Sequence, residues 1–282
     1  MRCLSPISLR TGVVGCGQCM PCRINKSRKW SGRMVLEASM HPPEFNHFVT
    51  LTYENPPRTL EGVPTLSRED GRLFRRRLGK ALGRDVRFFW AGEYGESTQR
   101  PHYHAVLFGL QSLQPRDLLQ EHWGLGHVHS DYLTIPRCNY AAGYVMKKIH
   151  GQSPDAGHPL RHVEFAQMSR RPAIADGYVK GIMIPYLHRG VGQKWIKANG
   201  DVPSSFRANG KMWPFTDRHR RMMRKAVGLP ERIVDIVRDT DLSPRLPDEF
   251  PTVEELTTRS VLYGKRTFRE KLFKASSRSR AV

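Results

Sequence analysis

The stretch Pro101-His102-Tyr103-His104-Ala105-Val106-Leu107-Phe108-Gly109 is the most informative part of this chain. Its apolar, β-branched and aromatic residues predict a strand. Side chains alternate between the two faces of a strand, so His102 and His104 should point the same way and could hold one divalent ion. The pattern alone is weak evidence, because His127-Val128-His129 repeats it. We interpret that second copy, which lies among glycines and polar residues, as loop or strand-edge histidines.

A carboxylate would come within reach of the two histidines if two neighbouring strands pair. Residues 87–93 are predicted to form a strand whose apolar residues, from Phe88 onward, precede Glu93, and the polar stretch 94–101 joins it to the histidine strand. Neighbouring strands of this kind usually pair as an antiparallel hairpin, which would bring Glu93 to the histidine face as an oxygen ligand. Glu96 is the alternative, but it falls in the predicted turn. Two imidazoles and a carboxylate leave open positions and suit Mg²⁺ or Mn²⁺ that engages a phosphate.

Two tyrosines follow about 40 residues later on a predicted helix, residues 139–149. Tyr140 and Tyr144 are four residues apart and therefore share one helix face, and Lys147 comes three residues after Tyr144. One interpretation is a half-buried aromatic pair beside solvated lysines. The other is a tyrosine nucleophile that attacks a metal-polarised phosphodiester, with a lysine to stabilise the developing charge.

Four of the five cysteines lie close to the N-terminus: Cys3, Cys16, Cys19 and Cys22. The last three have the spacing C-x2-C-x2-C. The first residues lack the apolar core of a secretion signal, so a metal is more consistent with this spacing than disulfides. Four thiolates would complete a structural Zn²⁺ site. A redox or iron–sulfur cluster and simple reduced thiols are the alternatives, and Cys138 is interpreted as an ordinary residue.

The remaining patterns predict an α+β fold. Residues 23–40 and 215–238 resemble basic helices, residues 48–53 a strand, and residues 67–82 a helix capped by Ser67. The charged face of that last helix, which we expect to be either solvated or functional, carries Arg72, Arg75, Arg76 and Lys80. We expect three parts: a Cys-rich basic module (1–40), a catalytic domain (41–200), and a basic C-terminal region (201–282) with a disordered Ser-Arg-rich tail.

The charge of the chain indicates a polyanionic partner. Its 282 residues include 46 Lys and Arg against 26 Asp and Glu, which gives a net charge of +20. Nucleic acid is the commonest partner of so basic a protein. A hydrophobic content of 39% is enough for a core, so a wholly disordered protein is not expected. No stretch approaches the ~18 consecutive apolar residues of a membrane helix, and we expect no membrane partner.

In combination, these patterns resemble known proteins. Three of them resemble, in order, the motifs of the HUH endonucleases that initiate rolling-circle replication: Phe48–Tyr53, Pro101–Gly109 and Tyr140–Lys148. Further stretches resemble the replication initiation proteins of gokushovirus-type microviruses, small single-stranded DNA phages: Cys16–Cys22, Gly92–Gly95 and Ser169-Arg170-Arg171-Pro172. One departure is that this chain has Ala173 and Ala175 where the family usually has glycines.

The resemblance implies an antiparallel sheet with helices behind it and a metal site on its central strands. It implies that His102 and His104 bind the metal, that Tyr144 and Tyr140 are nucleophiles, and that Lys147 assists them. The implied activity is nicking of the viral strand at the origin, with a 5′-phosphotyrosine link and later rejoining of ends to release circular DNA. It also implies single-stranded and origin DNA, host DNA polymerase and helicase as partners, in the host bacterial cytoplasm.

Two other interpretations stay open. A non-enzymatic, zinc-containing DNA- or RNA-binding protein fits the charge and the cysteines, but it gives no reason for the ordered histidine and tyrosine motifs. An HUH transposase or relaxase would use the same chemistry, although relaxases typically carry the tyrosine near the N-terminus.

Overall fold

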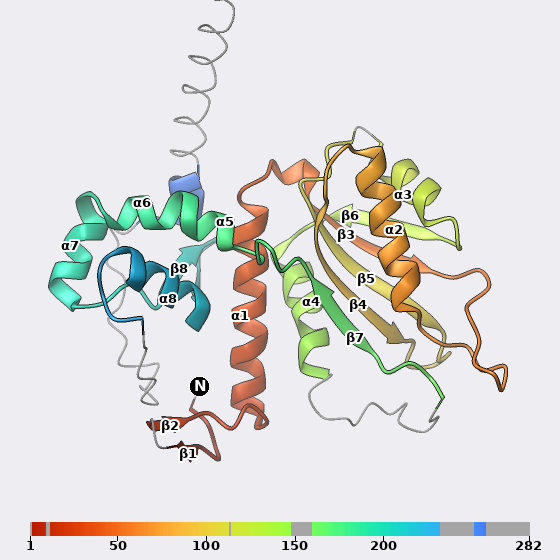
Figure 1. The fold of residues 1–282 in the computed structure, drawn as a ribbon, viewed down its shortest axis with the longest axis horizontal. Helices are drawn as coiled ribbons and strands as arrows, with labels where there is room; N and C mark the ends of the chain where they lie inside the picture. The colour runs from red at the N-terminus through yellow and green to blue at the C-terminus, as the bar shows by residue number, and fades with distance from the viewer. Residues whose placement is uncertain (1, 10–11, 113, 148–159, 232–250, 258–282) are drawn as a thin grey trace, which may run out of the picture. The chain divides into compact units, whose positions relative to one another are not determined.

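The computed structural model describes residues 2–9, 12–112, 114–147, 160–231 and 251–257 (Figure 1). The described residues up to Asp176 form one compact unit, and those from Gly177 onward form a second. The predicted division at residues 40 and 200 stays a prediction. No described helix is long and apolar enough to cross a membrane.

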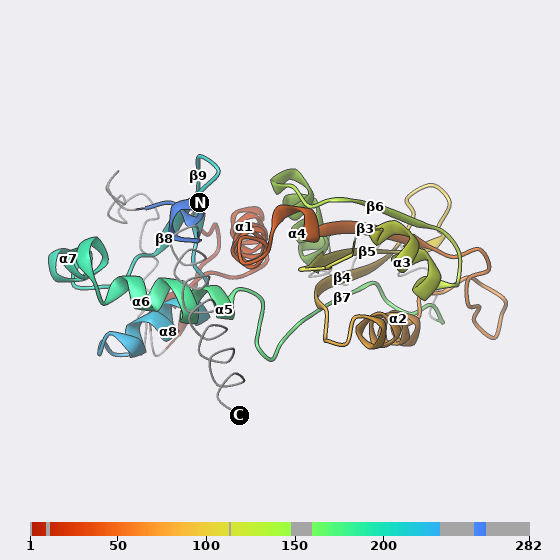
Figure 2. The same cartoon turned by 90° about the horizontal axis from the view of Figure 1, so that it is seen from above.

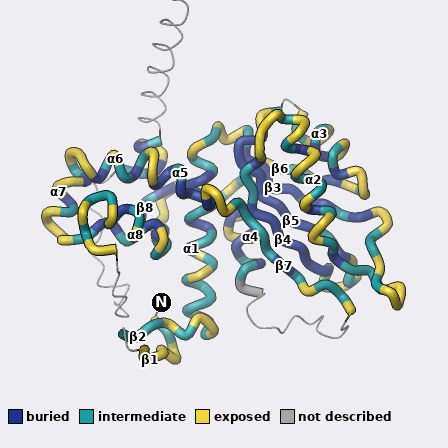
Figure 3. The backbone as a smooth tube through the Cα atoms, in the orientation of Figure 1, coloured by how far each residue is buried: buried dark blue, intermediate teal, exposed yellow. Residues whose placement is uncertain are grey.

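A five-stranded antiparallel sheet forms the centre of the first unit, in the order β6-β3-β5-β4-β7. Its strands are β3 (His47–Thr52), β4 (Arg87–Tyr94), β5 (Pro101–Phe108), β6 (Val128–Tyr132) and β7 (Phe165–Met168). The predicted hairpin is confirmed, because β4 pairs with β5 and Glu93 lies opposite His102. The histidine strand, β5, is the middle strand of the sheet. Most residues of the three central strands, β3, β5 and β4, are buried, whereas those of the edge strands β6 and β7 are mostly partly exposed (Figure 3).

Helices α2 (Arg68–Ala81) and α3 (Pro115–Trp123) cover one face of the sheet. The core there is aromatic: Trp90 and Tyr103 lie 5.0 Å apart between ring centroids, and the ring of Trp90 packs directly against Gly71 of α2. As predicted, Ser67 caps α2, and its hydroxyl accepts a hydrogen bond from the backbone of Asp70.

Helices α1 (Met20–Ala38) and α4 (Ile135–Lys147) pack against each other on the opposite, histidine-bearing face (Figure 2). Trp30 of α1 contacts the ring of Phe89 at 5.8 Å. A partly buried ion pair, Glu37 with Arg87 at 2.6 Å, connects α1 to the start of β4. The sheet therefore separates two environments, an aromatic core beneath α2 and α3 and a more polar face beneath α1 and α4.

The other elements are short. A hairpin of β1 (Ile7–Leu9) and β2 (Gly12–Val14) precedes α1, and the 3₁₀ turn η1 (Pro43–Phe45) follows it. The short helix α5 (Asp176–Tyr178) begins at the last residue of the first unit. The second unit then contains a π-helical turn (Val179–Met183), α6 (Ile184–Leu187), α7 (Gly190–Asn199), β8 (Ser205–Ala208), β9 (Lys211–Pro214) and α8 (Asp217–Ala226). The predicted helix at 215–238 corresponds to α8 in its first part, but α8 ends at Ala226 and residues 227–231 are not helical, since Gly228 has a left-handed backbone and Pro230 follows it. The rest of the predicted helix, like the predicted tail, lies outside the described residues. The α+β prediction is confirmed.

Candidate active site

Three potential metal ligands converge on the histidine face. Glu93 Oε1 lies 3.0 Å from His102 Nε2 and 3.2 Å from His104 Nε2. The ligand atoms of the three residues all lie within 4.8 Å of one another. The three side chains meet because of local strand pairing. Antiparallel pairing sets Glu93 opposite His102, and the two-residue period of β5 returns His104 to the same face. Glu96, the alternative carboxylate, is exposed in the β4–β5 turn and is outside this group.

The second nitrogen of each imidazole has its own partner. His102 Nδ1 lies 3.2 Å from the carbonyl oxygen of Arg100, which only accepts, so this nitrogen carries the proton. His104 Nδ1 lies 3.1 Å from the Thr50 hydroxyl. Such partners fix the tautomer and orientation of metal-binding histidines and leave the Nε2 lone pairs for the ion. The sequence patterns did not identify Thr50 as a partner of His104, because the two residues are 54 positions apart.

The electrostatics of the triad suit a cation. Burial opposes ionisation of Glu93, but hydrogen bonds from His102 and His104 lower its pKa to about 2. Burial disfavours the charged form of His102, yet its contact with Glu93 outweighs this and raises its pKa. The site thus holds an ionised carboxylate within hydrogen-bond distance of the Nε2 atoms of both imidazoles. Because metal ligands bind in their deprotonated forms, a divalent cation would displace any proton held between these atoms, and the donor set fits Mg²⁺ or Mn²⁺.

Both predicted tyrosines of α4 lie against His104. The Tyr144 ring is stacked on it at 5.1 Å between centroids and 10° between planes, and the Tyr140 ring meets it edge-on at 5.5 Å. Tyr144 is 2% exposed and Tyr140 is 54% exposed. Burial, followed by the contacts with Tyr140 and Glu93, raises the pKa of Tyr144 well above its usual range, so its phenol is neutral.

Lys147 is the last residue of α4, and its side chain lies outside the described part of the structure. The second His-x-His falls at the start of β6, a strand at the sheet edge, where exposed His129 lies 3.1 Å from Asp131. Within the described residues it belongs to no group of three metal-binding side chains.

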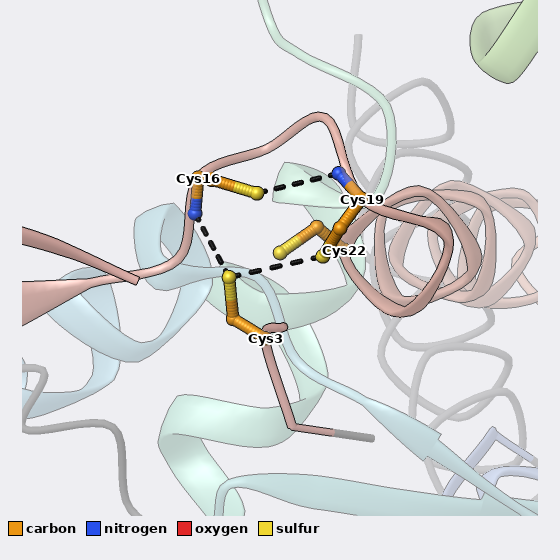
Figure 4. Close-up of side chains that lie close together, drawn as sticks. All are labelled: Cys3, Cys16, Cys19 and Cys22. Atoms are coloured by element: carbon orange, nitrogen blue, oxygen red, sulfur yellow. Dashed lines mark hydrogen bonds between the residues drawn. The ribbon is translucent and has the colours of Figure 1, made fainter. Parts of the chain in front are cut away.

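The four N-terminal cysteines form a second cluster (Figure 4). Their sulfur atoms lie within 4.8 Å of one another, and Cys3 Sγ and Cys19 Sγ are 3.7 Å apart. Tetrahedral zinc with Zn–S bonds of about 2.3 Å requires sulfur–sulfur separations of roughly 3.8 Å. The cluster therefore has the dimensions of a zinc site. The β1–β2 hairpin presents Cys3 and Cys16, while Cys19 and Cys22 lie at the first turn of α1.

Backbone amides surround these sulfurs. The N–H of Leu4 points at Cys19 Sγ (3.5 Å) and lowers the pKa of that thiol to about 6. The N–H groups of Cys19 and Gln18 do the same for Cys16, whose pKa is also lowered. Burial instead raises the pKa of Cys22 to about 12. Amides that stabilise thiolates are the expected surroundings of a thiolate metal site.

Comparison with known proteins agrees with the predicted family. Residues 46–152, which include the triad and both tyrosines, match the model of the ORF2-type family of replication-associated proteins. Over these residues the chain is similar to that family. The relatives it matches are phage replication-associated proteins, as the sequence predicted for microviruses, and no solved structure matches the chain.

Three relatives of the family show how far the similarity extends. Replication-associated protein VP4 of Bdellovibrio phage phiMH2K is 26% identical over 189 residues, 58% of this chain and 57% of the relative. Protein ORF4 of Chlamydia phage 1 is 28% identical over 156 residues, 48% of this chain and 38% of the relative. Protein ORF2 of Spiroplasma virus 4 is 30% identical over 160 residues, 48% of each. The chain thus spans less than two thirds of the length of each relative.

Proposed function

We propose that this chain initiates rolling-circle DNA replication as an HUH-type endonuclease and strand transferase. The observation that carries the proposal is the contact of two tyrosines with the Glu93, His102 and His104 triad, within the segment that matches a replication-associated family. A nucleophile beside a site for a divalent cation is the arrangement that phosphodiester transfer requires.

The proposed reaction conserves the phosphodiester energy. The phenol oxygen of Tyr140 or Tyr144 attacks the scissile phosphorus, a tyrosine O–P bond forms, the P–O3′ bond breaks, and the phenol proton ends on the 3′ oxygen. The products are a 5′-phosphotyrosine and a free 3′-OH. Attack by a 3′-OH on the phosphotyrosine reverses the exchange and rejoins ends. When bound, Mg²⁺ or Mn²⁺ would act as a Lewis acid that polarises the phosphate.

The residues of the chain divide this work. The triad would hold the cation, while Thr50 and the Arg100 carbonyl orient its imidazoles. Exposed Tyr140 is open to an incoming strand, and Tyr144 lies behind it against His104. This geometry favours Tyr140 for the first attack, leaving Tyr144 for a second transfer. Lys147 would stabilise the charge on the phenolate or the phosphate.

The other partners follow from this role. Origin DNA, single-stranded viral DNA, host polymerase and helicase are the proposed partners in the host cytoplasm, and the cysteine cluster would carry structural Zn²⁺. The strongest competitor is a non-enzymatic nucleic-acid-binding protein. It accounts for the charge and the cysteines but leaves the triad and both tyrosines without a role. A relaxase or transposase with the same site is less well supported, because the matched family is one of replication-associated proteins.

A covalent adduct tests the proposal. Because the origin is unknown, the probe is a pool of random single-stranded oligonucleotides labelled at the 3′ end, the end that stays with a 5′-phosphotyrosine. Wild-type protein with Mn²⁺ should give a labelled band that survives denaturation, and EDTA should abolish it. If the wild-type protein forms no adduct, the enzyme proposal is wrong.

Variants assign the roles in the same assay. Tyr140→Phe with Tyr144→Phe should abolish the adduct, and persistence there would defeat the tyrosine assignment. His102→Ala should also abolish it while salt-sensitive DNA binding persists. If His102→Ala removes binding as well, the site serves binding or folding instead of cleavage.

A further inference from the structure

A cationic groove lies on the α2 side of the sheet, away from the candidate active site. It encloses about 980 Å³ between α2, the start of β4 and the segment that follows β7. Phe88 in its wall is five residues from Glu93, about 17 Å along β4. The side chains of Phe88 and Glu93 also point to opposite faces, because they differ by an odd number of positions. The groove is therefore separate from the metal and tyrosine site.

Two rows of basic side chains line the groove. The first row comes from one face of α2 and the second from the Ser-Arg-Arg-Pro stretch, as follows: Arg72, Arg75, Arg76 and Lys80, then Arg170 and Arg171. Asp85 is the one acid among the lining residues. In the described part of the chain, Arg72 pairs with Glu69, but Arg76, Lys80, Arg170 and Arg171 make no ion pair. The positive charge of the groove is thus largely uncompensated.

The second row is held in place by the backbone. The Ser169 N–H donates to the carbonyl oxygen of Phe88 at 3.0 Å, and the Phe88 N–H donates to the Ser169 hydroxyl at 3.1 Å. The guanidinium group of Arg87 holds the carbonyl oxygens of Pro172 and Ala173. These bonds continue the β4–β7 ladder past its last paired residue. Arg170 and Arg171, both exposed, are therefore presented from a fixed wall.

Arg75 is the clearest sign that the groove takes an anion. Its guanidinium carbon lies 4.2 Å above the ring of Phe88, and its Nη1 is buried with no hydrogen-bond partner among the described residues. Burial and the nearby charge of Arg72 lower the pKa of Arg75 to about 10. A half-buried cation among like charges is costly unless an anion approaches it.

We propose that this groove binds the phosphate backbone of duplex DNA next to the segment that is cut. The choice of DNA as the polyanion rests on the proposed function. Duplex DNA carries one negative charge per ~1.7 Å of axis, the ligand that two rows of cations suit best. Sites for single strands add exposed aromatic rings for base stacking. Here the one lining ring, Phe88, is covered by Arg75.

Salt dependence of duplex binding tests the groove. The variant replaces four cations that make no ion pair: Arg76→Gln, Lys80→Gln, Arg170→Gln and Arg171→Gln. The matched control removes the same charge from four exposed cations elsewhere: Arg116→Gln, Lys194→Gln, Lys197→Gln and Lys211→Gln. Each protein is titrated with a fluorescent 20-base-pair duplex of arbitrary sequence, in EDTA, between about 50 and 200 mM salt.

Each lost phosphate contact reduces the slope of log K against log salt by ~0.9, so four should reduce it by ~3.6. Over this salt range the wild-type affinity should fall about 150-fold more than that of the groove variant. The control should keep the wild-type slope. If the groove variant and the control variant lose the same amount of slope, the groove proposal is wrong, because overall positive charge would then explain both losses. A loss as large for a single-stranded 20-mer as for the duplex would overturn the duplex assignment.

Two measurements separate other outcomes. Thermal unfolding should match the wild type, and if it does not, Arg170→Gln with Arg171→Gln alone, outside any helix, should still reduce the slope by ~1.8. Adduct formation on short single strands should be unchanged in the groove variant. A wild type that forms no adduct but shows the groove effect would refute the proposed enzyme function and leave the duplex-binding surface standing.

Discussion

The hydroxyl of Thr50 allows the metal site to be tested without removing a ligand. It lies 3.1 Å from His104 Nδ1, across the β3–β5 pairing that sets Thr50 opposite His104. Thr50→Val keeps the shape of the side chain and deletes this contact. One hydrogen bond of this kind contributes about 0.5–1.5 kcal/mol, which corresponds to a roughly 2- to 13-fold change in affinity. We expect the Kd for Mn²⁺, measured by isothermal titration calorimetry, to rise by this factor.

Thr52 provides a matched control for Thr50. It lies two residues away on the same face of β3, and its hydroxyl donates to the carbonyl oxygen of His127 instead of an imidazole, at 3.3 Å. Thr52→Val should leave the Kd for Mn²⁺ unchanged, and Thr50→Ser should restore it. Urea unfolding in EDTA shows whether either variant is simply less stable. If Thr50→Val and Thr52→Val bind Mn²⁺ equally well, the hydroxyl does not orient His104 and the reasoning is wrong.

Three further outcomes concern the core, the cysteine cluster and one strained residue. Tyr103→Phe removes a hydroxyl that bonds both backbone groups of Ser67 at 2.8 and 2.9 Å, and should lower the free energy of unfolding in urea by about 2 kcal/mol; no change would mean that water replaces the hydroxyl. Purified protein should contain one zinc per chain by elemental analysis, and Cys22→Ser should lose it, whereas a zinc-free wild type would remove the metal hypothesis. Ala175 has a left-handed backbone (φ 69°), so Ala175→Gly should raise the free energy of unfolding by about 1 kcal/mol and with it the melting temperature. Ala173→Gly should lower the melting temperature, and a change of the same sign in both variants would contradict the strain argument.

The parts of the site that were predictable from the sequence are those held together by local pairing. Glu93 and His102 are nine residues apart on a single hairpin, so the predicted pairing of two neighbouring strands brought them to one face, and strand alternation added His104. The partner of His104 depends instead on the register between β3 and β5, which sequence alternation leaves undetermined. The predicted start of α1 was also slightly wrong. The helix begins at Met20, before the predicted residue 23, because Pro21 is well accommodated in a first helical turn.

The cationic groove shows why a charged helix face cannot be interpreted from its own sequence. A row of arginines on α2 is equally consistent with a solvated face and with a binding surface. The residues that distinguish these two possibilities come about 90 residues later in the chain. There β7 joins the edge of the sheet beside β4, and Ser169 extends that pairing by one residue. Only then do Arg170 and Arg171 face α2 across a cavity. In Ser169-Arg170-Arg171-Pro172, the first and last residues thus fix the backbone and the middle two supply charge. A motif without any derivable chemistry of its own becomes half of a phosphate-binding surface.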